Sequence, residues 1–133
     1  MADEHVLLVE THVPVPMTVA DGTSVTKGSV MKLTDPNTAI INSGDNDVCA
    51  GILLGEKIAS NGQTKMGVYR GGQFRGTASG SVTVGDALSI DASVNHLKSA
   101  TTGANVNIVG YALETATTGE TFRYELNPSR KNS

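Results

Sequence analysis

Short runs of Val, Ile and Thr, broken by Gly, Asn-Gly or Asp at intervals of about eight to twelve residues, make up most of the chain. This spacing is typical of all-β proteins. No stretch keeps apolar residues at i, i+3, i+4 and i+7 over three turns, so the pattern predicts no amphipathic helix. The clearest strand is 121–126, where Phe122, Tyr124 and Leu126 alternate with polar positions and are predicted to face a core.

Nearly the same nine-residue pattern occurs twice, as VTKGSVMKL from Val25 and as VTVGDALSI from Val82. The similarity continues in AGILL against VGYAL and in NGQT against TGET. The offset between the copies is 57 at both ends and 59 in the middle, as insertions in connecting loops would produce. We therefore expect two similar β-meander halves, about residues 25–70 and 82–126, that pack as a compact β-sandwich or small β-barrel.

Three segments are expected: an extended N-terminal arm at 1–20, a single β domain at 21–127 and a flexible tail at 128–133. The arm contains a short apolar run followed by Pro14 and Pro16. Prolines favour extended backbone and are excluded from the central strands of a sheet. The arm would either form an edge strand on its own domain or lie on a neighbouring subunit, and both alternatives stay open.

Between the two halves, Gly71-Gly72 lies in the sequence KMGVYRGGQFRG. Two glycines readily take the positive φ values of a two-residue turn, so we expect a β-hairpin that sets Tyr69 opposite Phe74. An arginine–glycine RNA-binding box is the alternative, and two arginines in an acidic chain do not favour it.

Composition limits both the core and the class of partner. The 133 residues are 38% hydrophobic and 4% aromatic, without Trp, so small aliphatic side chains must fill the core. The formal net charge of -3 argues against nucleic acid as a partner, because nucleic-acid binders carry a basic stripe. No apolar run approaches the roughly 18–20 residues that span a bilayer, and no secretory signal is recognised. We expect a protein that is made in the cytoplasm and does not contact a membrane.

Candidate chemistry is scarce. The lone Cys49 lies in a predicted strand and is expected to be a buried thiol. His5 and His12 do not have the spacing of zinc ligands and are expected at the surface. Asp45-Asn46-Asp47 lacks the Gly and Glu that complete a calcium loop, so we interpret it as a polar loop tip. The sequence predicts no catalytic, metal or cofactor site, and no enzyme activity.

Four phrases, in their order along the chain, resemble one known family: PVPMTVADGTSVTKGSVMKLTDPNTA, AGILLGEKIASNGQTKMGVYRGGQF, VTVGDALSI and VGYALETATTGETFRYELNP. They span about residues 13–127 and are similar to the capsid decoration (cement) proteins of tailed viruses. The resemblance implies a small all-β protein that binds the outer surface of the assembled capsid and is not an enzyme. It also implies trimers that bridge capsomers, so the partners would be the major capsid protein and further copies of the chain.

With this resemblance, the N-terminal arm becomes a candidate contact with the capsid or with another subunit. The residues predicted to make that contact are His5, Val6, Leu7, Leu8, Val9, Val13, Pro14, Val15, Pro16 and Met17. Extended backbone of this kind can add a strand to an exposed sheet edge. The alternative function is a virion-displayed module that binds a host surface or a glycan.

Overall fold

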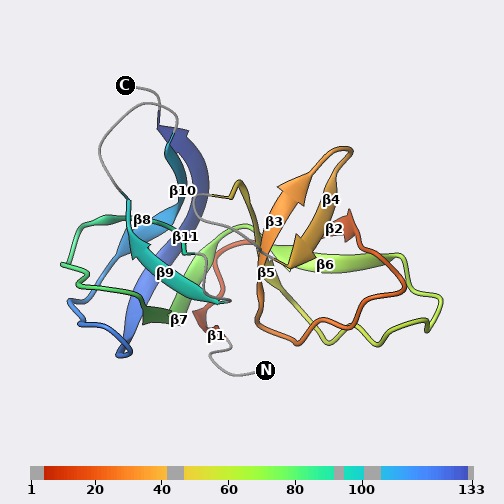
Figure 1. Cartoon of the computed structure of the whole chain (residues 1–133), viewed down its shortest axis with the longest axis horizontal. Helices are drawn as coiled ribbons and strands as arrows, with labels where there is room; N and C mark the ends of the chain where they lie inside the picture. The colour runs from red at the N-terminus through yellow and green to blue at the C-terminus, as the bar shows by residue number, and fades with distance from the viewer. Residues whose placement is uncertain (1–4, 42–46, 92–94, 101–105, 132–133) are drawn as a thin grey trace.

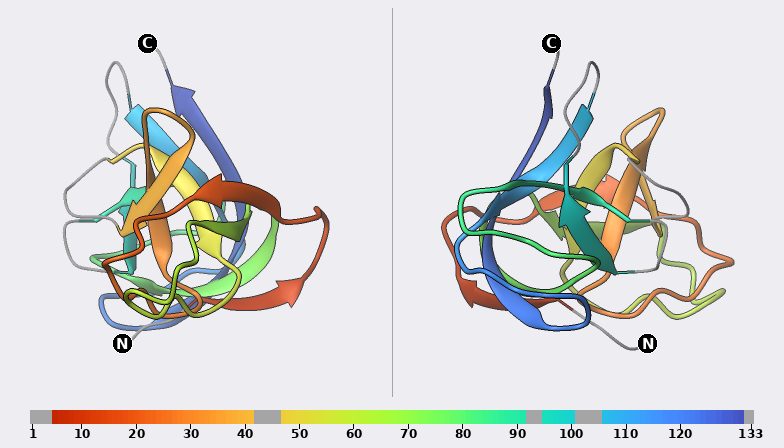
Figure 2. Two further views of the ribbon diagram at one scale, coloured as in Figure 1. Left: turned by 90° about the vertical axis from the view of Figure 1, so that its right-hand side faces the viewer. Right: turned by 60° about the vertical axis from the view of Figure 1, so that its left-hand side comes forward.

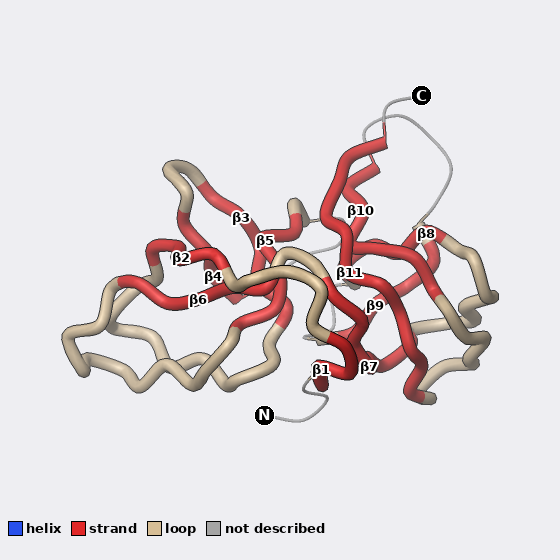
Figure 3. Tube along the Cα trace, turned by 180° about the vertical axis from the view of Figure 1, so that it is seen from behind, coloured by secondary structure: helices blue, strands red, loops and turns tan. Residues whose placement is uncertain are grey.

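The computed structural model describes residues 5–41, 47–91, 95–100 and 106–131 (Figure 1). Within them every regular element is a strand: β1 Val6–Val9, β2 Val15–Thr18, β3 Val30–Thr34, β4 Thr38–Ile41, β5 Cys49–Leu53, β6 Lys65–Tyr69, β7 Gly72–Ala78, β8 Ala87–Ile90, β9 His96–Ser99, β10 Val106–Ala112 and β11 Thr121–Lys131 (Figure 3). No helix in these ranges has the length and apolarity to cross a membrane. The predicted all-β class is confirmed.

The strands close into two barrels of five strands each. The first barrel has the strand order β2-β4-β3-β5-β6, and the second has the order β7-β11-β10-β8-β9, closed by pairing of β9 with β7. Each barrel has one parallel ladder, β2–β4 in the first and β7–β9 in the second, and its other ladders are antiparallel. β1 pairs with β7 on the outside of the second barrel (Figure 2).

The two barrels repeat one another in backbone detail, which confirms the repeat predicted from the sequence. Gly28 and Gly85 lead the chain into the equivalent strands β3 and β8 with φ angles of 82° and 91°. Gly62 and Gly119 precede β6 and β11 with φ angles of 86° and 84°. These angles lie in the left-handed region that favours glycine, so the same residue type stands at both places.

The strand predicted at residues 121–126 lies within β11. Its alternate side chains are buried as predicted: Phe122, Tyr124 and Leu126. Glu125 between them is exposed and Arg123 is half-buried, so one face of the strand meets the core and the other meets solvent. β11 continues to Lys131, where its end and β10 form a ribbon that projects beyond the rest of the second barrel (Figure 1).

The hairpin predicted at Gly71-Gly72 is wrong. β6 pairs with β5 and β2 in the first barrel, while β7 pairs with β1, β9 and β11 in the second. The two glycines instead link the barrels, and His12 lies so close to Gly71 that a Cβ there would overlap the imidazole ring. The rings of Tyr69 and Phe74 still meet across the link, edge to face, with centroids 5.6 Å apart.

Two buried clusters form the core. The smaller cluster fills the first barrel with Met17, Val19, Val25, Met31, Ala39, Ala50, Leu53, Met66 and Val68. The larger cluster fills the second barrel and extends into the first, where it includes Val30, Cys49, Ile52 and Tyr69. The predicted burial of Cys49 is confirmed, and that burial raises the pKa of its thiol to about 12. A thiol that stays protonated at neutral pH is a packing group and not a nucleophile.

Two glycines allow strands to approach closely at equivalent points of the barrels. Gly51 in β5 and Gly110 in β10 each lie beside a register shift in the ladder. A Cβ on Gly51 would overlap the carbonyl oxygen of Tyr69, and a Cβ on Gly110 would overlap that of Glu125. Each barrel therefore closes around a position where no side chain fits.

We predict that Gly110→Ala lowers the free energy of unfolding by about 2–4 kcal/mol, because the added methyl must push β10 away from β11. Gly22→Ala is the control, since a Cβ at Gly22 meets no atom within 4 Å. Its effect should stay within about 1 kcal/mol in either direction. Urea denaturation followed by circular dichroism measures both, and equal stability of the two variants would contradict the close packing.

Candidate interaction site at the junction of the barrels

The N-terminal segment, defined here as residues 5–18, runs across both barrels (Figure 1). In β1, Leu7 pairs with Phe74 of the second barrel, and in β2, Val15 pairs with Val68 of the first. Within this chain, β1 lies on the outside of the second barrel, and β2, which contains Pro16, is one of the five strands of the first barrel. The segment connects the barrels a second time, in addition to the glycine link between β6 and β7.

The residues predicted as contacts differ in exposure. Five of them are exposed: Val6, Val9, Val13, Val15 and Pro16. Three are half-buried: Leu7, Leu8 and Pro14. Two are buried: His5 and Met17. Val13 stands out because 83% of its surface is exposed, whereas the buried members pack inside the protein and serve the fold.

The prediction that His5 lies at the surface is wrong, whereas that for His12 is confirmed. The Nδ1 atom of His5 lies 2.6 Å from the Tyr124 hydroxyl, and its Nε2 lies 2.9 Å from the Asn95 carbonyl oxygen. Because a carbonyl oxygen only accepts, we assign the ring proton to Nε2, and Nδ1 then accepts from the phenol. Burial raises the pKa of Tyr124, which keeps this phenol a neutral donor.

Asn95, which bonds His5, also bonds the first barrel. It is fully buried, and its side-chain Oδ1 accepts the Val30 N–H of β3 at 2.9 Å. The backbone N–H of His5 also donates to the first barrel, to the Gly28 carbonyl at 2.8 Å. We call His5, Asn95 and Tyr124 the junction network, since its hydrogen bonds connect the N-terminal segment and both barrels.

The position of Asn95 in the repeat marks it as a turn residue. Asn95 has a φ of 64°, and Asn37 has a φ of 48° at the equivalent place in the first half. Asn tolerates the left-handed conformation better than most residues, so an Asn before β4 and another before β9 mark the same turn. Asp35-Pro36-Asn37, residue types that are typical of turns, form the turn between β3 and β4. Nothing in the sequence pattern indicated that Asn95 would contact the other barrel.

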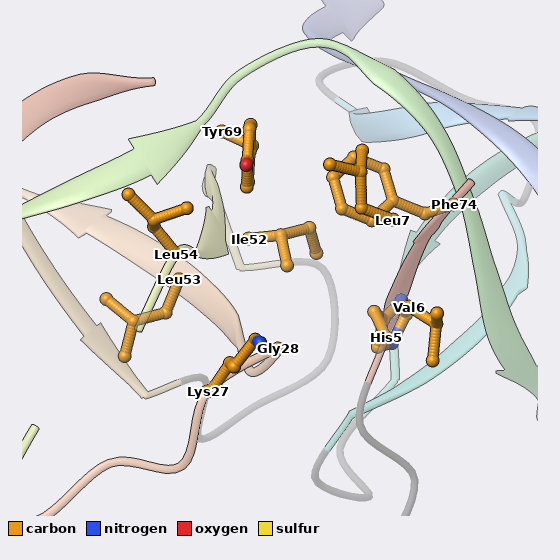
Figure 4. A pocket seen from close by; sticks show the side chains of 10 residues that line it. All are labelled: His5, Val6, Leu7, Lys27, Gly28, Ile52, Leu53, Leu54, Tyr69 and Phe74. Atoms are coloured by element: carbon orange, nitrogen blue, oxygen red, sulfur yellow. The ribbon is translucent and has the colours of Figure 1, made fainter. Parts of the chain in front are cut away.

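A cavity of about 350 Å³ opens between the barrels beside the junction network (Figure 4). Its lining comes from β1, β5, β6, β7 and the turn before β3: His5, Val6, Leu7, Lys27, Gly28, Ile52, Leu53, Leu54, Tyr69 and Phe74. Most of these side chains are apolar, and the imidazole of His5 is engaged with Tyr124. Within the described ranges no three His, Cys, Asp or Glu side chains come together to hold a metal ion. Of the predicted loop tip, Asp45 and Asn46 lie outside those ranges.

The first barrel also contains a buried lysine. Lys57 is 1% exposed, and its Nζ donates to Asp21 Oδ1 at 2.9 Å and to Asn61 Oδ1 at 2.8 Å. It donates as well to the backbone carbonyls of Asp21 and Ile58, at 3.1 and 2.7 Å. Four oxygens thus share the three protons of one ammonium, which ties the loop after β2 to the loop after β5.

The second barrel has no counterpart of this lysine. Lys57 forms an isolated bridge with Val25, and Ala116 forms the equivalent bridge with Val82. Ala116 is buried and apolar, so the same backbone position is filled by packing in one half and by a charged hydrogen-bonding group in the other. The sequence repeat predicted the shared backbone and not this difference in chemistry.

The family described as phage cement protein matches residues 9–126 of the chain. Among solved structures, the chain is similar to the N base of the head fiber gp8.5 of bacteriophage phi29, with 16% sequence identity and a TM-score of 0.59. The alignment covers 90% of this chain and 98% of that one. At this identity the likeness shows a shared fold. No curated protein matches the chain.

We predict that His5→Ala lowers the free energy of unfolding by about 2–4 kcal/mol, because it removes the imidazole that bonds the buried Tyr124 hydroxyl and opens a cavity. His12→Ala, in the same segment but exposed, is the control and should change it by less than about 0.5 kcal/mol. Chemical denaturation measures both variants. If they proved equally stable, the junction network would not hold the barrels together.

Asp21 gives a prediction for pH. The hydrogen bond from Lys57 lowers its pKa in the folded protein below the ordinary value of 3.8, while the unfolded chain keeps that value. Its stabilising effect is therefore present above about pH 4 and is lost as the pH falls through the folded pKa. We expect the melting temperature of Asp21→Asn to be lower than that of the wild type at pH 7. Between about pH 4.5 and pH 2.5, it should fall by less than the melting temperature of the wild type does. If the melting temperatures of the two proteins fell equally across this pH range, the stabilising role of the Asp21 carboxylate would be contradicted.

Proposed function

The chain belongs to the phage cement protein family, and we propose that it binds the outer surface of the assembled capsid and stabilises the shell by bridging capsomers. Family membership makes it a capsid-associated structural protein of the virion and not an enzyme. The family match carries the proposal, since residues 9–126 include nearly all of both barrels. The partner in this proposal is the major capsid protein.

We place one contact with the shell in the exposed part of the N-terminal segment. Val6, Val9, Val13, Val15 and Pro16 present apolar surface to solvent there. Fully burying one such valine against a partner contributes about 1.5–3 kcal/mol. The backbone between β1 and β2 also belongs to no strand, so it can pair with an exposed strand edge of the shell.

The two-barrel body suits a mechanical role. Both barrels are closed, and the junction network joins them, so little of the structure has to become ordered on binding. We infer that three copies act together around a three-fold or quasi-three-fold position of the shell. Once one copy is bound, the others contact the shell at a raised effective concentration, so modest contacts add to a tight attachment.

The alternative, a module that binds a host surface or a glycan, has less support. Four of the five aromatic side chains are buried: Tyr69, Phe74, Phe122 and Tyr124. Tyr111 is 37% exposed, which leaves one partly available ring, and glycan sites usually need aromatic platforms. The similar phi29 protein is described as the base of a head fiber, and this shared fold supports attachment to a head rather than sugar binding.

We predict that heads assembled without this chain release their DNA at a lower temperature than complete heads. When the salt concentration is lowered by dilution, they should also release it at a higher salt concentration than complete heads do. Adding the purified protein should restore both resistances, because capsomers would again be bridged. Genome release followed by a DNA-binding dye measures the effect. Heads of equal resistance with and without the protein would remove the stabilising role.

The contact in the N-terminal segment has its own test. We predict that Val13→Asp weakens binding to such heads by at least ~10-fold, since it places a charge in an apolar contact. Val84→Asp is the matched control, because Val84 is 58% exposed on a turn of the second barrel outside the segment. Co-sedimentation with the heads measures both. Equal binding by the two variants would place the contact elsewhere.

A further inference from the structure

The outer face of the second barrel carries two rows of side chains that cross the same four-stranded region. In the first row, Val6 of β1 pairs with Arg75 of β7, and Arg75 pairs with Arg123 of β11. The Leu113 N–H donates to the Arg123 carbonyl at 2.8 Å, which places Leu113 opposite Arg123 just after β10. Residues directly opposite in a ladder face the same side of the sheet. From β1 to the end of β10, the row therefore consists of an apolar residue, two arginines and another apolar residue.

The second row lies two residues further along the strands. Val9 pairs with Gln73, Gln73 pairs with Glu125, and Glu125 pairs with Tyr111 of β10. This row also begins and ends with an exposed apolar or aromatic side chain and has polar groups at its centre. Adjacent strands are about 4.8 Å apart, so the ends of each row are separated by about 14 Å.

A β-bulge brings Val6 and Val9 to the same face. The pairing of β1 with β7 shifts register between Leu7 and Val9. In a regular strand, residues three apart point to opposite faces, and the extra residue at the shift corrects this. Leu7 packs against the larger core cluster, while Val6 and Val9 are 53% and 43% exposed. The bulge thus exposes two valines that a regular strand would not place together.

The two arginines at the centre of the face are incompletely paired. Arg75 and Arg123 are directly opposite, where like charges destabilise a ladder. One ion pair is found for them within the described ranges, from Arg75 to Glu114 at 3.9 Å with both side chains well exposed. Glu114 also accepts the backbone N–H of Arg123 at 3.0 Å. The Nε of Arg123 is buried and has no hydrogen-bond partner among those residues.

We propose that this face, the Arg75–Arg123 face, is a docking surface that continues the contact of the N-terminal segment through Val6 and Val9, and that its occupant is a segment of the shell protein with a carboxylate flanked by apolar side chains. The carboxylate would relieve the repulsion between the two guanidinium groups, which bind carboxylates in a bidentate manner. The apolar groups would cover Val6 and Leu113 at one row and Val9 and Tyr111 at the other. Arginine and tyrosine surrounded by apolar contacts are the composition found at the centres of protein interfaces.

This proposal rests on the proposed function, because the shell protein is named there as partner. It adds the face of the molecule and the chemistry that the partner must present. The acidic residues already on the face, Glu114 and Glu125, explain why the partner needs a carboxylate placed at the arginine pair rather than a generally acidic surface. They also disfavour a phosphate backbone, which would approach both glutamates.

The test compares binding of charge variants to heads that lack the chain. Arg75→Glu should weaken co-sedimentation at least ~10-fold and reduce the dependence of binding on salt, and Arg75→Gln should have a smaller effect in the same direction. Lys65→Glu, an exposed charge reversal on β6 of the first barrel, is the control and should bind within about twofold of the wild type. The melting temperatures of all three variants show whether each is folded. If Arg75→Glu unfolds the chain, the binding of Arg75→Gln still tests the proposal.

Three different results would overturn the proposal, and each can be told from the others. Wild-type binding by both Arg75 variants would remove the docking surface and leave the proposed function intact. Failure of the wild type to bind the heads would remove both. A change in the self-association of the free protein, seen by light scattering with head binding unchanged, would make a second copy of the chain the occupant.

Discussion

Beside the core cluster that the two barrels share, two buried side chains, His5 and Asn95, join the barrels of this protein by hydrogen bonds. The imidazole of His5 bonds the second barrel through Tyr124 and Asn95, while its backbone bonds the first through Gly28. The amide of Asn95 bonds the first barrel through Val30. Because all of these groups are buried, breaking one bond exposes none of them to water, and each lost partner costs about 1–3 kcal/mol. This network and the shared core together hold the surfaces of the two barrels in place relative to one another.

The repeat explains why the fold is simple and why the two halves still differ. Barrel closure needs glycine at the turns and at the bulges, and both halves keep it at Gly28, Gly85, Gly51 and Gly110. Positions that closure does not constrain have diverged. The first half ties its end loops with the ammonium of Lys57, and the second half fills the same place with a buried methyl group. The two halves therefore share a backbone and differ in the side chains that it carries.

Local patterns predicted the features that depend on local physics. The alternation of apolar and polar residues predicted the buried face of β11, and the repeated phrases predicted the two halves. A lone cysteine in an apolar strand predicted a buried thiol. The failures are long-range. Gly71-Gly72 satisfies a hairpin turn and an interbarrel link equally well, and pairing of β6 with β5 and β2 decided between them. His5 looked like a surface residue because its partners, Asn95 and Tyr124, are 90 and 119 positions away. The prediction that His5 makes an outside contact rests on its position in the N-terminal segment and not on its own chemistry.

β1 is the element in which the proposed docking surface meets the interior of the protein. One side of it faces inward: Leu7 packs on the core, and His5 just before it enters the junction network. The other side faces outward with Val6 and Val9, on the face that also carries Arg75. A load applied to the outer side is therefore transmitted within a few residues to hydrogen bonds that join the barrels. The proposed role in holding capsomers together requires the contact surface to be continuous with the internal hydrogen bonds, since a contact on a loosely attached strand would detach before any force reached the two barrels. The bulge at Leu8 achieves this continuity by turning two valines outward without removing Leu7 from the core.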